Sequence, residues 1–312
     1  MEKITMSKKS NLSIQEAFDL FIRKCKIKNL TDLSISSYEK KMVHFYEFID
    51  KSEPITAVSK DTVDDYILWL RENTEANDIT INSYLRSVRA FLYYCMDENI
   101  IPTFKIQLIK TQKKVKETYS TEELERLLEK PDVDNCSFSC YKTWVFENYL
   151  LGTGNRISTA LDLHIGDINF QDWLITLRKT KNRKQQIIPL SHTLAEILQE
   201  YLQIRGGEPE DYVFCNEYGQ KASDRTYQQL VRRYNRKRGV EKTSCHLFRH
   251  TYAKMAVLNG IDPFRLMRLM GHSDLSVTRE YVQMFGRDLQ LDYEKFNPLD
   301  NLKSRSKGTI RM

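Results

Sequence analysis

Six side chains between residues 156 and 281 have the chemistry needed to cut and rejoin a phosphodiester without a metal ion. They are Arg156, Lys181, His246, Arg249, His272 and Tyr281. Guanidinium groups hold a phosphate through paired donors, a geometry that an ammonium cannot supply. A lysine and two histidines can move protons or donate hydrogen bonds to a developing negative charge. A tyrosine hydroxyl can attack phosphorus and hold the strand covalently. The ordered set, rather than any single member, predicts this chemistry.

The motifs around these residues resemble those of the tyrosine recombinase, or phage integrase, family. The resemblance is strongest over residues 120–285, in the segments TGNRIS, KTKNRK, HLFRH and GHSDLSVTREYV. It implies an enzyme that exchanges strands between DNA duplexes through a 3′-phosphotyrosyl intermediate. It also implies that no cofactor is needed.

The resemblance implies a role for each group. Arg156 and Arg249 would bind the scissile phosphate, and Lys181 would protonate the leaving oxygen. Tyr281 would be the nucleophile, while the two histidines of the set would assist proton transfer and stabilise the phosphate. His250, directly after Arg249, would at most support the site.

One position departs from the family pattern. The family usually places a carboxylate three residues after the first arginine, where it braces that arginine, and this chain has Thr159 there. Asp162 is close in sequence, but on a helix it lies too far round to replace the missing carboxylate. The change predicts slower catalysis or a different brace for Arg156, and it removes no reacting group.

The composition predicts a two-domain protein located in the cytoplasm. The chain has 312 residues, of which 41% are hydrophobic and 29% charged, values typical of globular proteins. No apolar run reaches the roughly 20 residues needed to cross a bilayer, and the N-terminus lacks the apolar stretch of a secretory signal. Six cysteines without a regular spacing predict reduced, mostly structural thiols and no metal site.

The distribution of basic residues predicts a nucleic-acid partner, here double-stranded DNA. The formal net charge is only +6, but basic runs occur at 105–116, 178–184, 232–238 and 303–311. Several such runs beside groups for phosphate chemistry favour a polyanion over simple solvated surfaces. The residues expected to contact DNA outside the catalytic set are Arg86, Arg89, Lys110, Lys113, Lys114 and Arg183.

The predicted fold is mainly α with a small β-hairpin. Residues 1–104 show four amphipathic patterns, which predict a helical bundle that the resemblance identifies as a core DNA-binding domain. A basic linker is expected at 105–118, followed by a mixed α+β catalytic domain at 119–286. Strands are predicted at 172–177 and 186–189, and the polar turn between them would carry Lys181.

The tail, residues 287–312, is expected to mediate assembly. Leu289, Tyr293 and Phe296 fall at i, i+4 and i+7, a one-sided apolar face that would pack either on its own domain or on a neighbour. The resemblance implies docking in trans. We therefore expect a monomer in free solution and a tetramer on synapsed DNA.

Several other functions fit parts of the pattern. His246 and His250 have zinc-ligand spacing, but no glutamate base stands between them and Arg249 would place a positive charge beside a metal. A DNA-binding module without catalysis and a type IB topoisomerase-like enzyme remain alternatives. Within the recombinases, two functions remain open: an integrase or transposase of a mobile element, and an enzyme that resolves chromosomes or plasmids.

Overall fold

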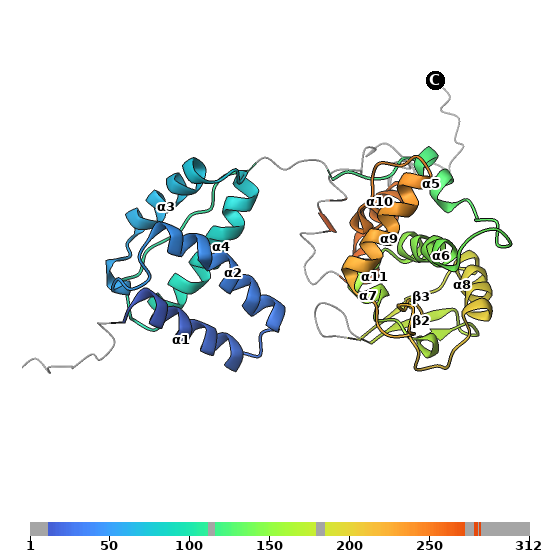
Figure 1. Cartoon of the computed structure of the whole chain (residues 1–312), viewed down its shortest axis with the longest axis horizontal. Coiled ribbons are helices and arrows are strands. Elements are labelled where there is room, and N and C mark those ends of the chain that lie inside the picture. The colour runs from blue at the N-terminus through green and yellow to red at the C-terminus, as the bar shows by residue number, and fades with distance from the viewer. Residues whose placement is uncertain (1–11, 112–115, 179–184, 272–277, 280, 282–312) are drawn as a thin grey trace, which may run out of the picture. The chain divides into compact units, whose positions relative to one another are not determined.

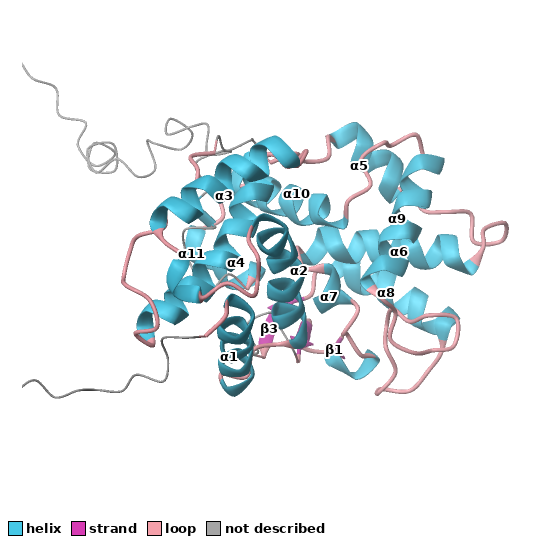
Figure 2. Cartoon of the chain, turned by 60° about the vertical axis from the view of Figure 1, so that its left-hand side comes forward, coloured by secondary structure: helices cyan, strands magenta, loops and turns pink. Residues whose placement is uncertain are grey.

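The computed structural model describes residues 12–111, 116–178, 185–271, 278–279 and 281. The chain divides into two compact units, 1–114 and 115–312, and each has its own hydrophobic core. Both units are largely helical (Figures 1 and 2). The predicted fold class, mainly α with a small antiparallel sheet, is confirmed.

The first unit is a bundle of four helices. These are α1 (Ile14–Ile27), α2 (Asp32–Phe48), α3 (Lys60–Asn73) and α4 (Asp78–Asp97), with a short 3₁₀ turn, η1 (Ile55–Ala57), before α3. Each helix begins at a residue whose side chain accepts a hydrogen bond from the first turn, namely Ser13, Thr31, Ser59 and Asn77. Helix α4 contacts the other three helices, and the aromatic side chains of all four fill the core between them.

The chain that leaves α4 continues along the surface of the same unit. Ile106 is buried in its core, and the backbone N–H of Ile106 donates to the Tyr93 hydroxyl at 3.3 Å. The Asn82 amide both donates to and accepts from the backbone of Ile109, at 2.8 and 2.9 Å. Part of the segment 105–118, expected as a linker, is therefore packed on the bundle, and Lys110 is exposed beside it.

The second unit is built around one central helix. Helix α6 (Phe138–Thr153) packs against α5, α8, α9 and α10, and most of its residues are buried. A helix that is apolar around its whole circumference is stable only when other elements cover every face. The helices around it are α5 (Thr121–Leu128), α7 (Ile157–Ala160), α8 (His192–Arg205), α9 (Asp224–Lys237), α10 (Cys245–Leu258) and α11 (Pro263–Met270).

A small sheet lies at one side of this unit. A 3₁₀ turn, η2 (Ile165–Asp167), leads into β1 (Ile168–Asn169), which pairs with β2 (Leu174–Leu177); β2 in turn pairs with β3 (Gln186–Pro189). All pairs are antiparallel, and Ile175 faces Ile188 in the β2–β3 register. The predicted hairpin is confirmed, whereas β1 was not predicted because two residues carry no readable alternation.

A carboxyl group is completely buried in the middle of α6. Glu147 is 0% exposed, and neither of its oxygens has a hydrogen-bond partner in the described part of the chain. Burial raises its pKa well above the usual value, and the positive charge of Arg238 opposes this only in part. Glu147 is therefore held as the neutral acid, since an unpaired carboxylate would be too costly there.

We expect Glu147→Gln to stabilise the protein at high pH. The unfolded chain ionises Glu147 above its ordinary pKa while the folded chain keeps the proton, so wild-type stability falls as pH rises through this window. The loss is about 1.4 kcal/mol per pH unit at most. Thermal unfolding at pH 4 and pH 8 tests this. The melting temperature of the variant should exceed that of the wild type more at pH 8 than at pH 4. An equal difference at both pH values would contradict it.

Candidate active site

Arg156 is presented by a tight turn at the end of α6. Gly154 ends the helix with φ +64°, and a Cβ at this position would lie 2.4 Å from the Tyr252 ring. Glycine is therefore required both for the backbone conformation and for the close approach. The buried Asn155 amide donates to the Tyr149 hydroxyl at 2.9 Å and holds the turn. Arg156 then forms the N-cap of α7 and is half-buried.

Arg249 joins three elements of the unit. Its side chain is buried on α10 and donates to the Gly154 carbonyl at 2.7 Å and to the Met270 carbonyl at 2.8 Å. Gly154 is the first residue of the turn after α6, and Met270 is the last residue of α11. Burial, together with repulsion from Arg156, lowers the pKa of Arg249 to about 10, so the group stays cationic at neutral pH. The guanidinium has further N–H donors for a phosphate.

Arg156 is the second cation of the site and lacks the expected brace. Within the described residues, its guanidinium makes no hydrogen bond, and burial lowers its pKa. Thr159 is buried nearby, but only its backbone N–H bonds to Arg156, at the carbonyl oxygen. Asp162 forms an ion pair with Lys221 instead, which agrees with its expected position away from Arg156.

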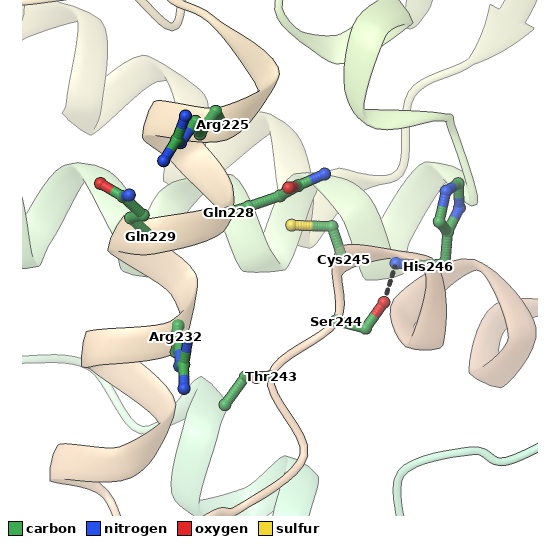
Figure 3. Close-up of a pocket in the computed structure, with 8 residues that line it drawn as sticks. All are labelled: Arg225, Gln228, Gln229, Arg232, Thr243, Ser244, Cys245 and His246. Carbon is green, nitrogen blue, oxygen red and sulfur yellow. Dashed lines mark hydrogen bonds between the residues drawn. The ribbon is translucent and has the colours of Figure 1, made fainter. Parts of the chain in front are cut away.

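His246 lies in the first turn of α10, where its backbone N–H donates to Ser244 Oγ at 3.3 Å. It borders a pocket of about 330 Å³, shown in Figure 3. Burial and then the positive charges of Arg249 and Arg156 lower its pKa, so the ring is neutral at pH 7. A neutral imidazole can donate one hydrogen bond to a phosphate oxygen and accept another.

The opposite wall of this pocket was not predicted as part of the site. Four exposed side chains of α9 line it, at positions i, i+3, i+4 and i+7: Arg225, Gln228, Gln229 and Arg232. Only Arg232 belongs to a basic run noted in the sequence. The others lie on the polar face of an amphipathic helix. The sequence of such a face does not indicate which element lies opposite it.

Tyr281 is buried against α10 and α11. It is 2% exposed and packs with Ala253, Leu266 and Met270. Its hydroxyl lies 2.6 Å from His250 Nδ1, and Lys116 Nζ lies 4.3 Å from its ring centroid. Tyr281 is also close enough to influence the pKa of both Arg156 and Arg249.

The structure thus brings together four of the six predicted catalytic residues: Arg156, His246, Arg249 and Tyr281. Lys181 and His272 lie outside the described residues, as do Lys113, Lys114 and Arg183. Two further side chains, those of Lys116 and His250, contact Tyr281. Lys116 had been noted only as part of a basic run, and His250 only as a supporting residue.

The remaining predicted DNA contacts belong to the first unit. Arg86 is exposed on α4, and the guanidinium of Arg89, on the same helix, lies 6.0 Å from the Tyr93 ring centroid. Within the described ranges, no three His, Cys, Asp or Glu side chains form a group that could hold a metal ion. No described helix is long and apolar enough to cross a membrane.

Comparison with known proteins places both units in one family. The model of the phage integrase family matches residues 117–286, and that of the phage integrase SAM-like domain matches residues 14–115. The chain therefore belongs to the phage integrase family. It is a tyrosine recombinase, an enzyme that cleaves and rejoins DNA through a tyrosine intermediate, as the sequence motifs predicted.

The relatives include recombinases of several kinds. A tyrosine recombinase of Pseudothermotoga lettingae is 27% identical over 88% of this chain and 94% of its own. The tyrosine recombinase XerD of Oceanobacillus iheyensis is 24% identical over 87% of this chain and 94% of its own. Among solved structures, the Tn1549 transposon integrase in complex with circular intermediate DNA has the same fold, with a TM-score of 0.71 and 20% identity over 92% of this chain and 99% of that one.

We expect Arg156→Lys and Arg249→Lys each to lower the cleavage rate by about 10²–10³-fold, because a lysine cannot reproduce the paired donors. The two variants should differ in stability. Arg249→Lys also loses the bonds to Gly154 and Met270, so its melting temperature should fall, whereas that of Arg156→Lys should not. Single-turnover cleavage and thermal unfolding measure both effects. Strand exchange near the wild-type rate by either variant would contradict the phosphate-binding role.

Proposed function

We propose that this protein is a site-specific recombinase of the integrase or transposase type, in which Tyr281 attacks a DNA phosphate bound by Arg156 and Arg249. One observation carries this proposal. Tyr281 lies close enough to Arg156 and Arg249 to influence the pKa of both guanidiniums, and Arg249 bonds no carboxylate among the described residues. Such a site favours an anion.

The chemistry requires no external energy source. The phosphotyrosyl bond retains the free energy of the broken phosphodiester, and the 5′-hydroxyl of a partner strand reverses the attack. Catalysis then depends on stabilising the charge at a five-coordinate phosphorus and on delivering protons. We assign charge stabilisation to the two arginines and to His246. Lys181 gives a proton to the leaving oxygen, and His272 helps to stabilise the phosphate.

The pocket between α9 and His246 supports contact with DNA close to the reacting phosphate. Its wall combines Arg225 and Arg232 with Gln228 and Gln229 (Figure 3). Arginine binds phosphates and the edge of guanine, and glutamine pairs with adenine in the major groove. We therefore propose that α9 contacts the duplex beside the cleavage site, in addition to the DNA contacts expected of Arg86, Arg89, Lys110, Lys113 and Lys114.

We further propose that the substrate belongs to a mobile element and that the enzyme acts in the cytoplasm. The similarity to a transposon integrase supports this reading, and resolution of chromosomes or plasmids is the second candidate. The sequences that flank the gene discriminate between them. Inverted or attachment repeats at both ends indicate a mobile element, and their absence indicates resolution.

Assembly forms part of the proposal. A monomer in free solution would build a tetramer on two DNA sites by exchanging residues 287–302 between subunits. Deletion of the chain after Gly286 should then preserve binding to a single site and abolish the pairing of two sites. A native gel with one and two labelled duplexes measures this. Normal pairing by the truncated protein would show that the tail does not act between subunits.

Tyr281→Phe should abolish cleavage and leave DNA binding largely intact. The change removes one oxygen, the nucleophile, and keeps the buried ring that packs on α10 and α11. A nicked substrate, resolved on a denaturing gel, traps the covalent adduct of the wild type. An adduct that persists in the variant would exclude Tyr281. Relaxation of a supercoiled plasmid that lacks the recombination site would instead favour a topoisomerase.

A further inference from the structure

The nucleophile of this enzyme needs a group that takes its proton. A phenol has a pKa of about 10 and is almost entirely protonated at neutral pH, yet the oxygen that attacks phosphorus must lose its hydrogen. In the structure, Tyr281 Oη lies 2.6 Å from His250 Nδ1, which is the distance of a short hydrogen bond. No other part of the proposed mechanism uses His250.

We propose that His250 is a catalytic residue of this reaction, and that its Nδ1 accepts the proton of the Tyr281 hydroxyl as that oxygen attacks phosphorus. This inference rests on the proposed function, because it assigns a partner to the same nucleophile. The geometric requirement for a general base, hydrogen-bond distance to the proton that it removes, is met by the contact between the two side chains.

Helix α10 holds this acceptor in a defined place relative to the phosphate site. His250 directly follows Arg249, whose buried guanidinium is bonded to two backbone carbonyls. It lies one turn after His246, so a single helical face carries both histidines. On its other side, Thr251 Oγ1 accepts the backbone N–H of Tyr119 at 2.9 Å. The segment that carries His250 is therefore anchored on both sides.

Burial and the surrounding charges keep the His250 ring unprotonated. Burial, followed by the positive charges of Lys116, His246 and Arg249, lowers the pKa of His250 to about 4, so the imidazole is neutral at physiological pH. A bound phosphodiester brings a negative charge to the same site. It offsets the cations and makes the ring more basic at the stage when the proton must be accepted.

Lys116 supports the other half of the transfer. Its Nζ lies 4.3 Å from the centroid of the Tyr281 ring. A cation at this distance is attracted to the ring, and it stabilises the negative charge that develops on the phenol oxygen as the proton leaves. Lys116 thus favours loss of the proton from the phenol, while the same charge lowers the pKa of the acceptor His250.

The step balances in both directions. During cleavage the Oη–P bond forms and the Oη–H bond breaks, with the proton passing to Nδ1. The P–O5′ bond breaks, and its electron pair leaves on the 5′-oxygen, which takes a proton from a separate acid. During rejoining the 5′-hydroxyl oxygen attacks phosphorus and gives its proton back to that separate acid, the P–Oη bond breaks, and protonated His250 returns its proton to the departing tyrosine oxygen. Loss of His250 should therefore slow cleavage and rejoining alike.

A change in the acidity of the nucleophile tests this role directly. The full chain is prepared as wild type and as His250→Asn, which keeps a polar group near Nδ1 without its basicity, each with either tyrosine or a ring-fluorinated tyrosine at position 281. His250→Gln is measured alongside, so that a failure of one variant to fold does not decide the result. His192→Asn, on α8 of the same unit, is the matched histidine control.

Single-turnover cleavage of the nicked substrate is then followed against pH. We expect His250→Asn to lower the rate by about 10²–10⁴-fold at pH 7, with a rate that rises with pH toward the phenol pKa. Fluorination makes the phenol more acidic. It should raise the cleavage rate of His250→Asn by about tenfold or more and change the wild-type rate little. A 5′-bridging phosphorothiolate should give no such rescue, because it relieves only the leaving oxygen.

The outcomes separate this inference from the function on which it rests. If fluorination has the same effect in the wild type and in both His250 variants, or if His250→Asn retains the wild-type rate, His250 only holds the ring in place and the inference is overturned. If the wild type itself forms no phosphotyrosyl adduct, the proposed function fails together with it.

Discussion

The buried guanidinium of Arg249 is the interaction on which the site depends. Its bonds to the Gly154 and Met270 carbonyls join the end of α6, the start of the Arg156 turn and the end of α11. Two of the carbonyls that helix ends leave unpaired are thereby satisfied by a charged donor. One residue thus fixes the position of the turn that carries Arg156 relative to α11, against which Tyr281 packs.

The charges of the site are unfavourable to one another without an anion. The pKa values of Arg156, His246, Arg249 and His250 are all lowered, because each group is partly buried and most are repelled by another. A scissile phosphate relieves both effects at once. Asp162, the acidic residue nearest Arg156 in the sequence, is paired with Lys221 instead.

Tyr281, the proposed nucleophile, is held in a closed environment. Tyr281 is 2% exposed, with His250 at its hydroxyl and Lys116 at its ring face. Burial protects a reactive group from water, and it also requires that the phosphate enter a site shaped by α10, α11 and the turn after α6. In the proposed mechanism, Arg249 binds the phosphate and the next residue of the same helix, His250, accepts the proton of the nucleophile.

The sequence alone determined the helical class and the hairpin of β2 and β3, and it led to the proposed set of reacting residues. These follow from local periodicity, turn chemistry and residue type. Only the tertiary structure decided that His250 meets Tyr281, that Lys116 covers its ring, and that α9 faces His246. Such contacts join residues far apart in the chain, and no local pattern records which helix faces which.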